Sequence, residues 1–261
     1  MNKLLMLRNF LYVLIGTILF IGFFFKLMYW PGAGHMLSVS LCGISILSVM
    51  YAIRNRKSQL WIHHIILPVF LNAFALSVLF KIMHWQLANV LLVISMTGMS
   101  LTFFEAAQRM RKSITAVIPA MFGLSLILAL FKIMHWPSIN PLSFLHLFIM
   151  VLIPVLLFIR GKQLKQTAPS LSSQMMMASA LTLISALIEL SAVIGRDGLD
   201  LNQSLVDFAQ VLISLGIIIT IGKVIQKEDL KSNSQNDYLL LHCLGVFYIV
   251  LLMFQIMKSW N

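Results

Sequence analysis

The stretch that decides the architecture of this chain is FKIMHWQ at residues 80–86, because it recurs as FKIMHWP at residues 131–137. An earlier copy, FKLMYWP, occupies residues 25–31, and a degenerate copy, FQIMKSW, occupies residues 254–260. The lysines of the first three copies are 55 and 51 residues apart, which is the length of one helical hairpin with its connecting loops. A string that recurs at such regular spacing indicates tandem duplication of a hairpin unit.

Each complete copy closes an apolar segment that is long enough to cross a bilayer as a helix. Of the 261 residues, 60% are hydrophobic and only 10% are charged, which leaves too few charges to cover a soluble domain of this size. We therefore predict an all-α fold, a polytopic transmembrane helical bundle of about nine spans, built from repeated helical hairpins. The predicted spans cover residues 5–29, 35–53, 61–84, 87–107, 114–135, 141–159, 175–195, 203–222 and 238–259.

The repeats divide the chain into five parts. Three hairpin repeats are expected at residues 1–57, 58–112 and 113–165, and a divergent hairpin without the motif at 166–231. A single C-terminal span with the degenerate motif follows at 232–261. Since each repeat contains two spans, all copies are expected to point the same way across the membrane, related by an axis along its normal.

Basic residues are distributed unevenly over the predicted loops. Lys and Arg number 19 against 8 Asp and Glu, a formal net charge of +11. The positive-inside bias predicts a bacterial inner-membrane protein with a cytoplasmic N-terminus and a periplasmic C-terminus. No nucleic-acid partner is predicted, because the charges form short clusters between apolar runs. Fourteen basic residues lie on the predicted cytoplasmic side: Lys3, Arg8, Arg54, Arg56, Lys57, Arg109, Arg111, Lys112, Arg160, Lys162, Lys165, Lys223, Lys227 and Lys231.

The side chains of the motif suggest an outer-leaflet polar cluster above a belt of aromatic anchors. Lysine and histidine three residues apart are expected to share one helix face, with tryptophan next to them. Snorkelling lysine and headgroup-level tryptophan are typical of membrane anchoring, yet three near-identical copies hint at specific partners as well. The predicted cluster contains Lys26, Lys81, His84, Lys132, His135, Glu189 and Asp207, and the predicted anchors are Trp30, Trp85, Trp136 and Trp260.

The motif, its Trp-Pro-Gly-Ala turn and the glycine seventeen positions past the lysine (Gly43 and Gly98) resemble the two-helix membrane part of GldL. GldL is the inner-membrane motor subunit of gliding motility and type 9 secretion. The resemblance covers residues 1–160, and it implies that the hairpins assemble around a partner's helices and that the motif lysines and histidines belong to a polar intramembrane network. The family has a carboxylate in the second helix of its hairpin, and the resemblance does not extend to that group. Predicted spans two and six contain no acid, and span four contains only Glu105.

Two acids lie inside the predicted spans of the divergent hairpin, Glu189 and Asp207. Intramembrane acids are expensive and functional by default. We expect Glu189 to pair with Lys81 or Lys132, which would offset the desolvation of both groups; a structural ion pair and a transport role both fit. Glu105 stands four residues before Arg109, which predicts an interfacial ion pair on one helix.

No cofactor or metal site is predicted. Cys42 and Cys243 stand alone in apolar runs, and the adjacent His63 and His64 point in different directions on a helix. The sequence therefore favours a non-enzymatic component of a membrane complex, a scaffold or a channel-like element, with the lipid bilayer and a membrane protein or an anionic lipid as its expected partners. The first alternative is a small transporter or a binder of anionic lipid or solute, and the second is an intramembrane enzyme.

Overall fold

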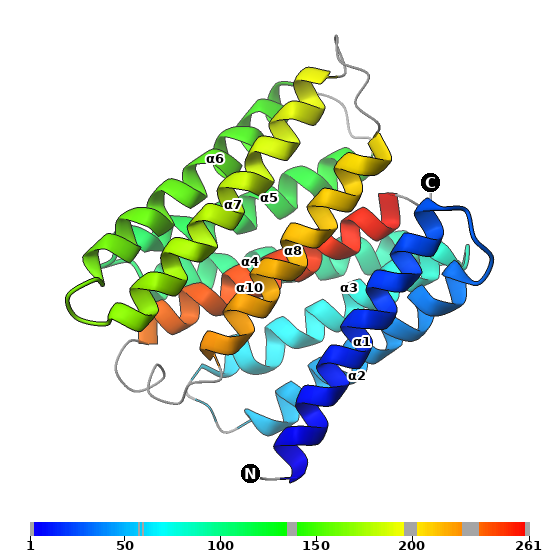
Figure 1. Cartoon of the computed structure of the whole chain (residues 1–261), viewed down its shortest axis with the longest axis horizontal. Coiled ribbons are helices and arrows are strands. Elements are labelled where there is room, and N and C mark those ends of the chain that lie inside the picture. The colour runs from blue at the N-terminus through cyan, green and yellow to red at the C-terminus, as the bar shows by residue number, and fades with distance from the viewer. Residues whose placement is uncertain are drawn as a thin grey trace. The chain divides into compact units, whose positions relative to one another are not determined.

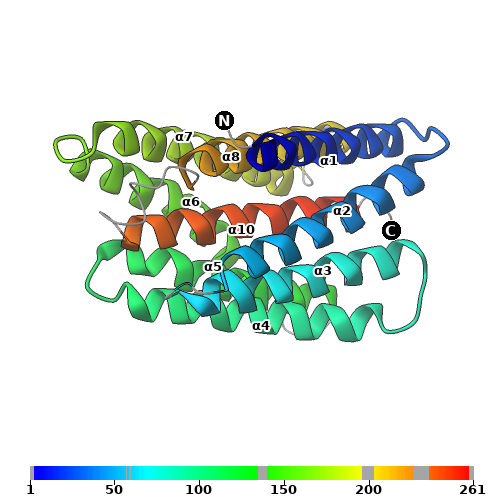
Figure 2. The same cartoon turned by 90° about the horizontal axis from the view of Figure 1, so that it is seen from below.

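The computed structural model describes residues 3–56, 58, 60–134, 140–195, 203–225 and 235–258. The chain divides into two compact units, residues 1–98 with 256–261 (unit 1) and residues 99–255 (unit 2). Figures 1 and 2 show that the described chain is helical throughout, with no strand among those residues. The prediction of an all-α fold is confirmed.

Unit 1 is formed by helices that pack with their neighbours in the chain. Helix α1 packs on α2, and α2 packs on α3 (Figures 1 and 2). A short π-helical turn, Ile62–Ile66, leads directly into α3. The helices are α1 (Lys3–Leu27), α2 (Ala33–Arg54), α3 (Leu67–Ile82) and the first half of α4 (Ala88–Arg109).

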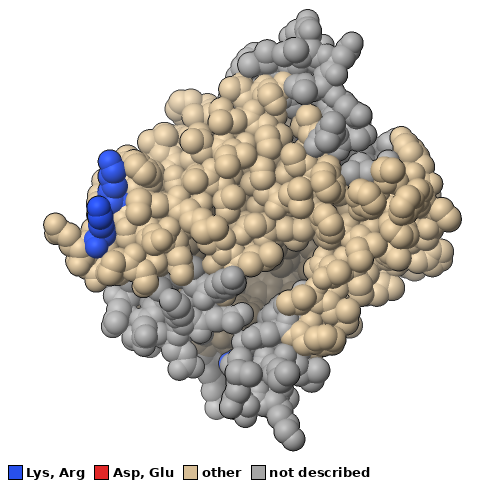
Figure 3. All heavy atoms as spheres, in the orientation of Figure 1, with Lys and Arg blue, Asp and Glu red and all other residues tan. Residues whose placement is uncertain are grey.

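Unit 2 contains the rest of α4 and five further helices. Helices α6 and α7 run side by side, and α7 also packs on α8 (Figure 1). On the face shown in Figure 3, Lys and Arg side chains gather at the end where α6 meets α7, while the described surface along α7 is uncharged. The helices are α5 (Val117–Ile133, after a 3₁₀ turn at Ile114–Ala116), α6 (Asn140–Gln163), α7 (Pro169–Gly195), α8 (Gln203–Ile225) and α10 (Gln235–Lys258).

Within the described residues, each of the nine predicted apolar segments coincides with a helix to within a few residues at its ends, and two of them begin with the π-helical turn Ile62–Ile66 and the 3₁₀ turn Ile114–Ala116. Six helical stretches among the described residues are long and apolar enough to cross a membrane, which is compatible with an integral membrane protein. Helices satisfy their backbone polar groups internally, as a bilayer demands. The number of nine spans stays a prediction. The six stretches are Ala33–Arg54, Ile62–Ile82, Ala88–Arg109, Ile114–Ile133, Pro169–Ser191 and Gln235–Met257.

Glycine permits close helix packing at equivalent places in the first two predicted hairpins. A Cβ atom at Gly43 would lie 2.8 Å from the side chain of Ile15, and one at Gly98 would clash with the ring of Phe70. Ile15 and Phe70 each precede the motif lysine of their hairpin by eleven residues. The two hairpins therefore make the same contact, although common ancestry of the repeats stays a prediction.

Serine hydroxyls link neighbouring helices in unit 2. The hydroxyl of Ser100 on α4 donates to the Gly123 carbonyl on α5 at 2.7 Å, and that of Ser179 on α7 donates to the Pro154 carbonyl on α6 at 2.7 Å. Such bonds fix the register of apolar helices that have little hydrophobic reason to choose one neighbour over another in lipid.

Candidate functional site

The repeated motif forms a helix C-cap. In the first copy, Trp30 N–H donates to the Phe25 carbonyl at 2.8 Å and Tyr29 N–H donates to the Lys26 carbonyl at 3.2 Å. Tyr29 adopts a left-handed conformation with φ of 56°. These two bonds around a left-handed residue define a Schellman cap, and the ring contact between Phe25 and Trp30, at 5.0 Å between centroids, is its usual hydrophobic partner.

The second copy repeats this cap with the same dimensions. Trp85 N–H donates to the Phe80 carbonyl at 2.8 Å, His84 N–H donates to the Lys81 carbonyl at 3.2 Å, and the Phe80 and Trp85 rings lie 5.0 Å apart. His84 has a φ of 53°. The expectation that Lys81 and His84 share one helix face is therefore wrong, because α3 ends at Ile82 and His84 lies in the turn beyond it.

The turn contains a second left-handed position, six residues past the lysine. It is occupied by Gly32, with φ of 90°, in the first hairpin and by Leu87, with φ of 71°, in the second. The carbonyls of both residues accept a hydrogen bond from the first turn of the following helix. The near-identity of these two copies is therefore explained by the turn that they form. Each turn contains two left-handed residues, and the contact between the phenylalanine and tryptophan rings stabilises it.

The polar and aromatic side chains of the motif lie at helix ends. Lys26 and Lys81 are half-buried, and Lys132 is exposed. Lys26 lines a shallow surface pocket of about 230 Å³ together with Trp30 and the start of α2, Gly32 to Gly34. His84, Trp30 and Trp85 are exposed. The predictions for His135, Trp136 and Trp260 lie outside the described residues.

A polar cluster lies among apolar residues in unit 2; we call it the Glu189 cluster. The amide Nε2 of Gln210 on α8 donates to Ser185 Oγ at 2.7 Å and lies 3.5 Å from Glu189 Oε1, both on α7. The hydroxyl of Tyr248 on α10 is hydrogen-bonded to Ser185. The cluster comprises Ser185, Glu189, Gln210, Ser214 and Tyr248.

The cluster extends inward from one end of its helices. Glu189 stands six residues before the end of α7, which is about 9 Å along the helix axis. Ser185 lies one turn deeper on the same face, and both fall within the membrane-compatible stretch Pro169–Ser191. Asp207, which is buried, lies one turn from Gln210 on α8. The two predicted acids therefore belong to adjacent helices, and their pairing with Lys81 or Lys132 stays a prediction.

Two buried atoms of the cluster have no hydrogen-bond partner among the described residues: Gln210 Oε1 and Ser214 Oγ. Gln210 is 2% exposed and Ser214 is fully buried. The two residues are four apart on α8 and so share one face. Buried polar atoms normally find a partner in protein or ordered water.

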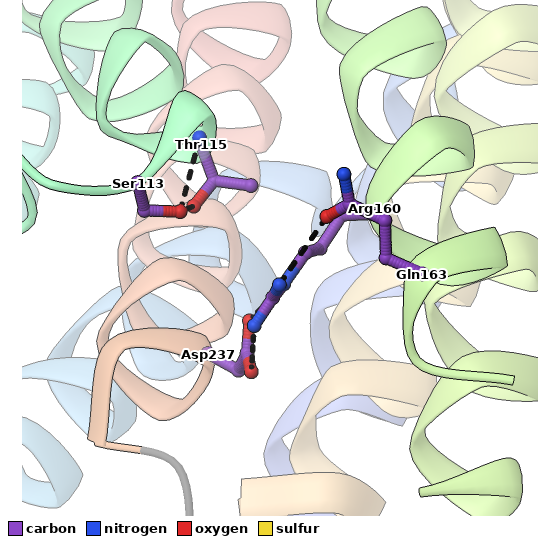
Figure 4. A network of polar contacts seen from close by, with 5 residues as sticks. All are labelled: Ser113, Thr115, Arg160, Gln163 and Asp237. Atoms are coloured by element: carbon purple, nitrogen blue, oxygen red, sulfur yellow. Dashed lines mark hydrogen bonds and ion pairs between the residues drawn. The ribbon is translucent and has the colours of Figure 1, made fainter. Parts of the chain in front are cut away.

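An ion pair with no counterpart in the sequence predictions joins α6 to α10 (Figure 4). Arg160 donates from Nε to Asp237 Oδ1 and from Nη2 to Oδ2, both at 2.8 Å. The Asp237 side chain is 1% exposed and that of Arg160 is 25% exposed. The bond to Asp237 raises the pKa of the Arg160 guanidinium above its ordinary value, against an opposing effect of burial.

Two polar contacts at other helix ends hold helical segments in place. His64 Nδ1 and the Tyr51 hydroxyl lie 2.6 Å apart and join the π-helical turn to α2. Glu105 and Arg109 form a partly exposed ion pair one helical turn apart, which confirms that prediction. Within the described part of the chain, no three His, Cys, Asp or Glu side chains gather as a metal site would require.

In comparisons with known proteins, no family model matches this chain, and neither does any curated protein or solved structure.

Proposed function

We propose that the chain is a multi-pass inner-membrane protein and a non-enzymatic component of a membrane complex, in which the Glu189 cluster serves as a channel-like element for ions. The observation that carries the proposal is the contact of Glu189 with Gln210, within a hydrogen-bonded set that continues to Ser185 and Tyr248. A carboxylate at the bilayer centre costs about 2.5–3.5 kcal/mol on insertion scales, and one nearer a helix end, such as Glu189, costs less. Acids inside membrane helices commonly mark an ion path.

The partners of Glu189 support ion handling rather than simple anchoring. A charged side chain that only anchors a helix end needs no more than access to the lipid headgroups. Glu189 instead faces an amide donor on the adjacent helix, and Ser185 and Tyr248 extend the polar contacts one turn deeper. Both Ser185 and Tyr248 are at most 2% exposed. This continuation toward the bilayer centre is what a path for an ion requires.

Membership of a complex rests on the resemblance of the hairpins to GldL, whose hairpins assemble around a partner's helices.

The proposed orientation, with the N-terminus in the cytoplasm, rests on the basic residues of the loops. A single-cysteine variant at Arg111, in a background without Cys42 and Cys243, tests that orientation. Labelling of this cysteine by an impermeant reagent in intact cells would contradict it.

Ion flux into vesicles tests the proposed function. The protein, purified in mild detergent with whatever stays bound, is reconstituted with an entrapped dye that reports protons or Na⁺, and a potassium gradient with valinomycin sets the voltage. We expect flux above that of empty vesicles, reduced at least tenfold in Glu189→Gln. Glu105→Gln is the matched control, because Glu105 pairs with Arg109 at a partly exposed helix end. Equal flux in wild type and Glu189→Gln, or none in the wild type, would overturn the channel role.

The pocket beside Lys26 favours a second candidate function, binding of an anionic headgroup. A lysine next to the first backbone N–H groups of α2 offers both a charge and helix-end donors to a phosphate. Native mass spectrometry of the purified protein tests this. Bound anionic lipid that is lost in Lys26→Gln and kept in Lys112→Gln would support it, and lipid retained equally in both variants would exclude the pocket.

A further inference from the structure

We infer that Gln210 and Ser214, with the carboxylate of Glu189, form a binding site for a small monovalent cation such as Na⁺. The inference rests on the proposed function, because it names the ligand class of the same cluster. It starts from two buried oxygen atoms on one face of α8 that have no hydrogen-bond partner within the described residues, Gln210 Oε1 and Ser214 Oγ.

The geometry of Gln210 leaves its amide oxygen free to bind a ligand. Its Nε2 group is directed at Ser185 Oγ, at 2.7 Å, and at Glu189 Oε1, at 3.5 Å. An amide nitrogen has two hydrogens, and these contacts turn it toward two oxygen acceptors, which leaves Oε1 on the other side of the amide. The oxygen is a pure acceptor with two lone pairs, and it sits in a side chain that is 2% exposed.

Ser214 differs from Thr182, Ser191 and Thr220, three other hydroxyl residues of α7 and α8. Thr182, Ser191 and Thr220 each donate to a carbonyl of their own helix, at 2.8–2.9 Å. That local bond is the usual way for a hydroxyl to be satisfied inside a membrane helix. Ser214 is completely buried and makes no such bond. Its oxygen is therefore available to a ligand that lies one helical turn from Gln210.

The donor set selects the class of ligand. Amide, hydroxyl and carboxylate oxygens are the ligands of hard cations, whereas softer metals prefer imidazole or thiolate. Calcium takes six to eight oxygens, usually with several carboxylates, and magnesium keeps most of its water. One carboxylate beside two neutral oxygens suits a single positive charge. A bound cation would also place its charge beside Glu189 at a depth where water is scarce.

Thermal unfolding of the purified protein in nanodiscs tests the inference. The unfolding midpoint is measured in NaCl and in choline chloride of equal ionic strength. At Na⁺ about 100-fold above its dissociation constant, we expect the midpoint to rise by at least about 5 °C. The rise should be lost in Ser214→Ala and in Glu189→Gln. Ser191→Ala, which removes a locally bonded hydroxyl from α7, should keep it.

The variants keep the test decisive. Ser214→Ala removes a buried hydroxyl that has no partner, so it is expected to fold at least as well as the wild type. No Na⁺-dependent rise, or an equal rise in wild type and Ser214→Ala, would overturn the inference and indicate water as the occupant. If Na⁺ binds specifically while the vesicles show no flux, the site exists and the channel role fails. If flux depends on Glu189 while Na⁺ has no effect on unfolding, the channel role stands and the cation site fails.

Discussion

Removing either partner of the Arg160–Asp237 ion pair should destabilise unit 2, and the two losses should not add in the double variant. The carboxylate of Asp237 is 1% exposed and accepts two bonds at 2.8 Å from one guanidinium. Breaking a buried ion pair from one side costs about 3–5 kcal/mol, since it leaves the other charge buried and uncompensated. The two sides of this pair are not equivalent, because 25% of the Arg160 side chain reaches solvent.

The magnitudes follow from that asymmetry. Arg160→Met strands a fully buried carboxylate, so we expect a loss of about 4 kcal/mol in the free energy of unfolding. Asp237→Asn leaves a guanidinium that can turn toward water, and we expect about 2 kcal/mol. The double variant should lose about 3 kcal/mol, which gives a coupling energy of about 3 kcal/mol between the two residues.

The assay is equilibrium unfolding in mixed micelles, with helix content followed by circular dichroism. The matched control is the same cycle with Glu105→Gln and Arg109→Met, whose side chains are 24% and 38% exposed; a pair this exposed should couple by less than about 1 kcal/mol. Effects at Arg160 and Asp237 that add within about 0.5 kcal/mol would refute the reasoning, because no energy would then depend on the contact.

Three further predictions concern the turns, the helix packing and the predicted lysine pairing. Leu87→Gly should raise the free energy of unfolding by about 1 kcal/mol in the same assay, since φ of 71° strains any residue with a Cβ; no gain would mean that the leucine side chain contributes as much as the strain costs. Gly98→Ala should lower it by about 1–3 kcal/mol, because the added methyl would clash with an aromatic ring on α3; an unchanged value would show that the ring moves aside freely. Glu189→Gln combined with Lys81→Met or Lys132→Met should lose less than the sum of the single changes if a lysine pairs with the acid, and additive losses for both lysines would end that prediction.

Much of the fold can be predicted from the sequence because local chemistry determines it. Apolar runs of about 20 residues must be helices in a bilayer, and the described residues of each predicted segment fall within a helix apart from one or two at an end. The short-range ion pair Glu105–Arg109 could also be predicted from the sequence, since helical spacing alone brings the two side chains together. Glu189 and Asp207 could be singled out because an acid in an apolar run is conspicuous whatever its surroundings.

The remaining features depend on packing between distant segments. Asp237 precedes its predicted span by one residue, and nothing local indicates that its partner lies 77 positions earlier at Arg160. Gln210 is neutral, so its contact with Glu189 becomes visible only when α7 and α8 are placed together. The cap formed by the motif was hidden for a different reason: tyrosine and histidine are unusual at left-handed positions, where glycine is the common signal.

The most direct test of the central claim is the infrared difference spectrum of the protein in lipid nanodiscs, recorded on exchange of choline for Na⁺. We expect a carboxyl band that changes with Na⁺, vanishes in Glu189→Gln and persists in Glu105→Gln. A Na⁺ response that is unchanged in Glu189→Gln, or no carboxyl response in the wild type, would contradict the claim that Glu189 binds Na⁺ within the membrane.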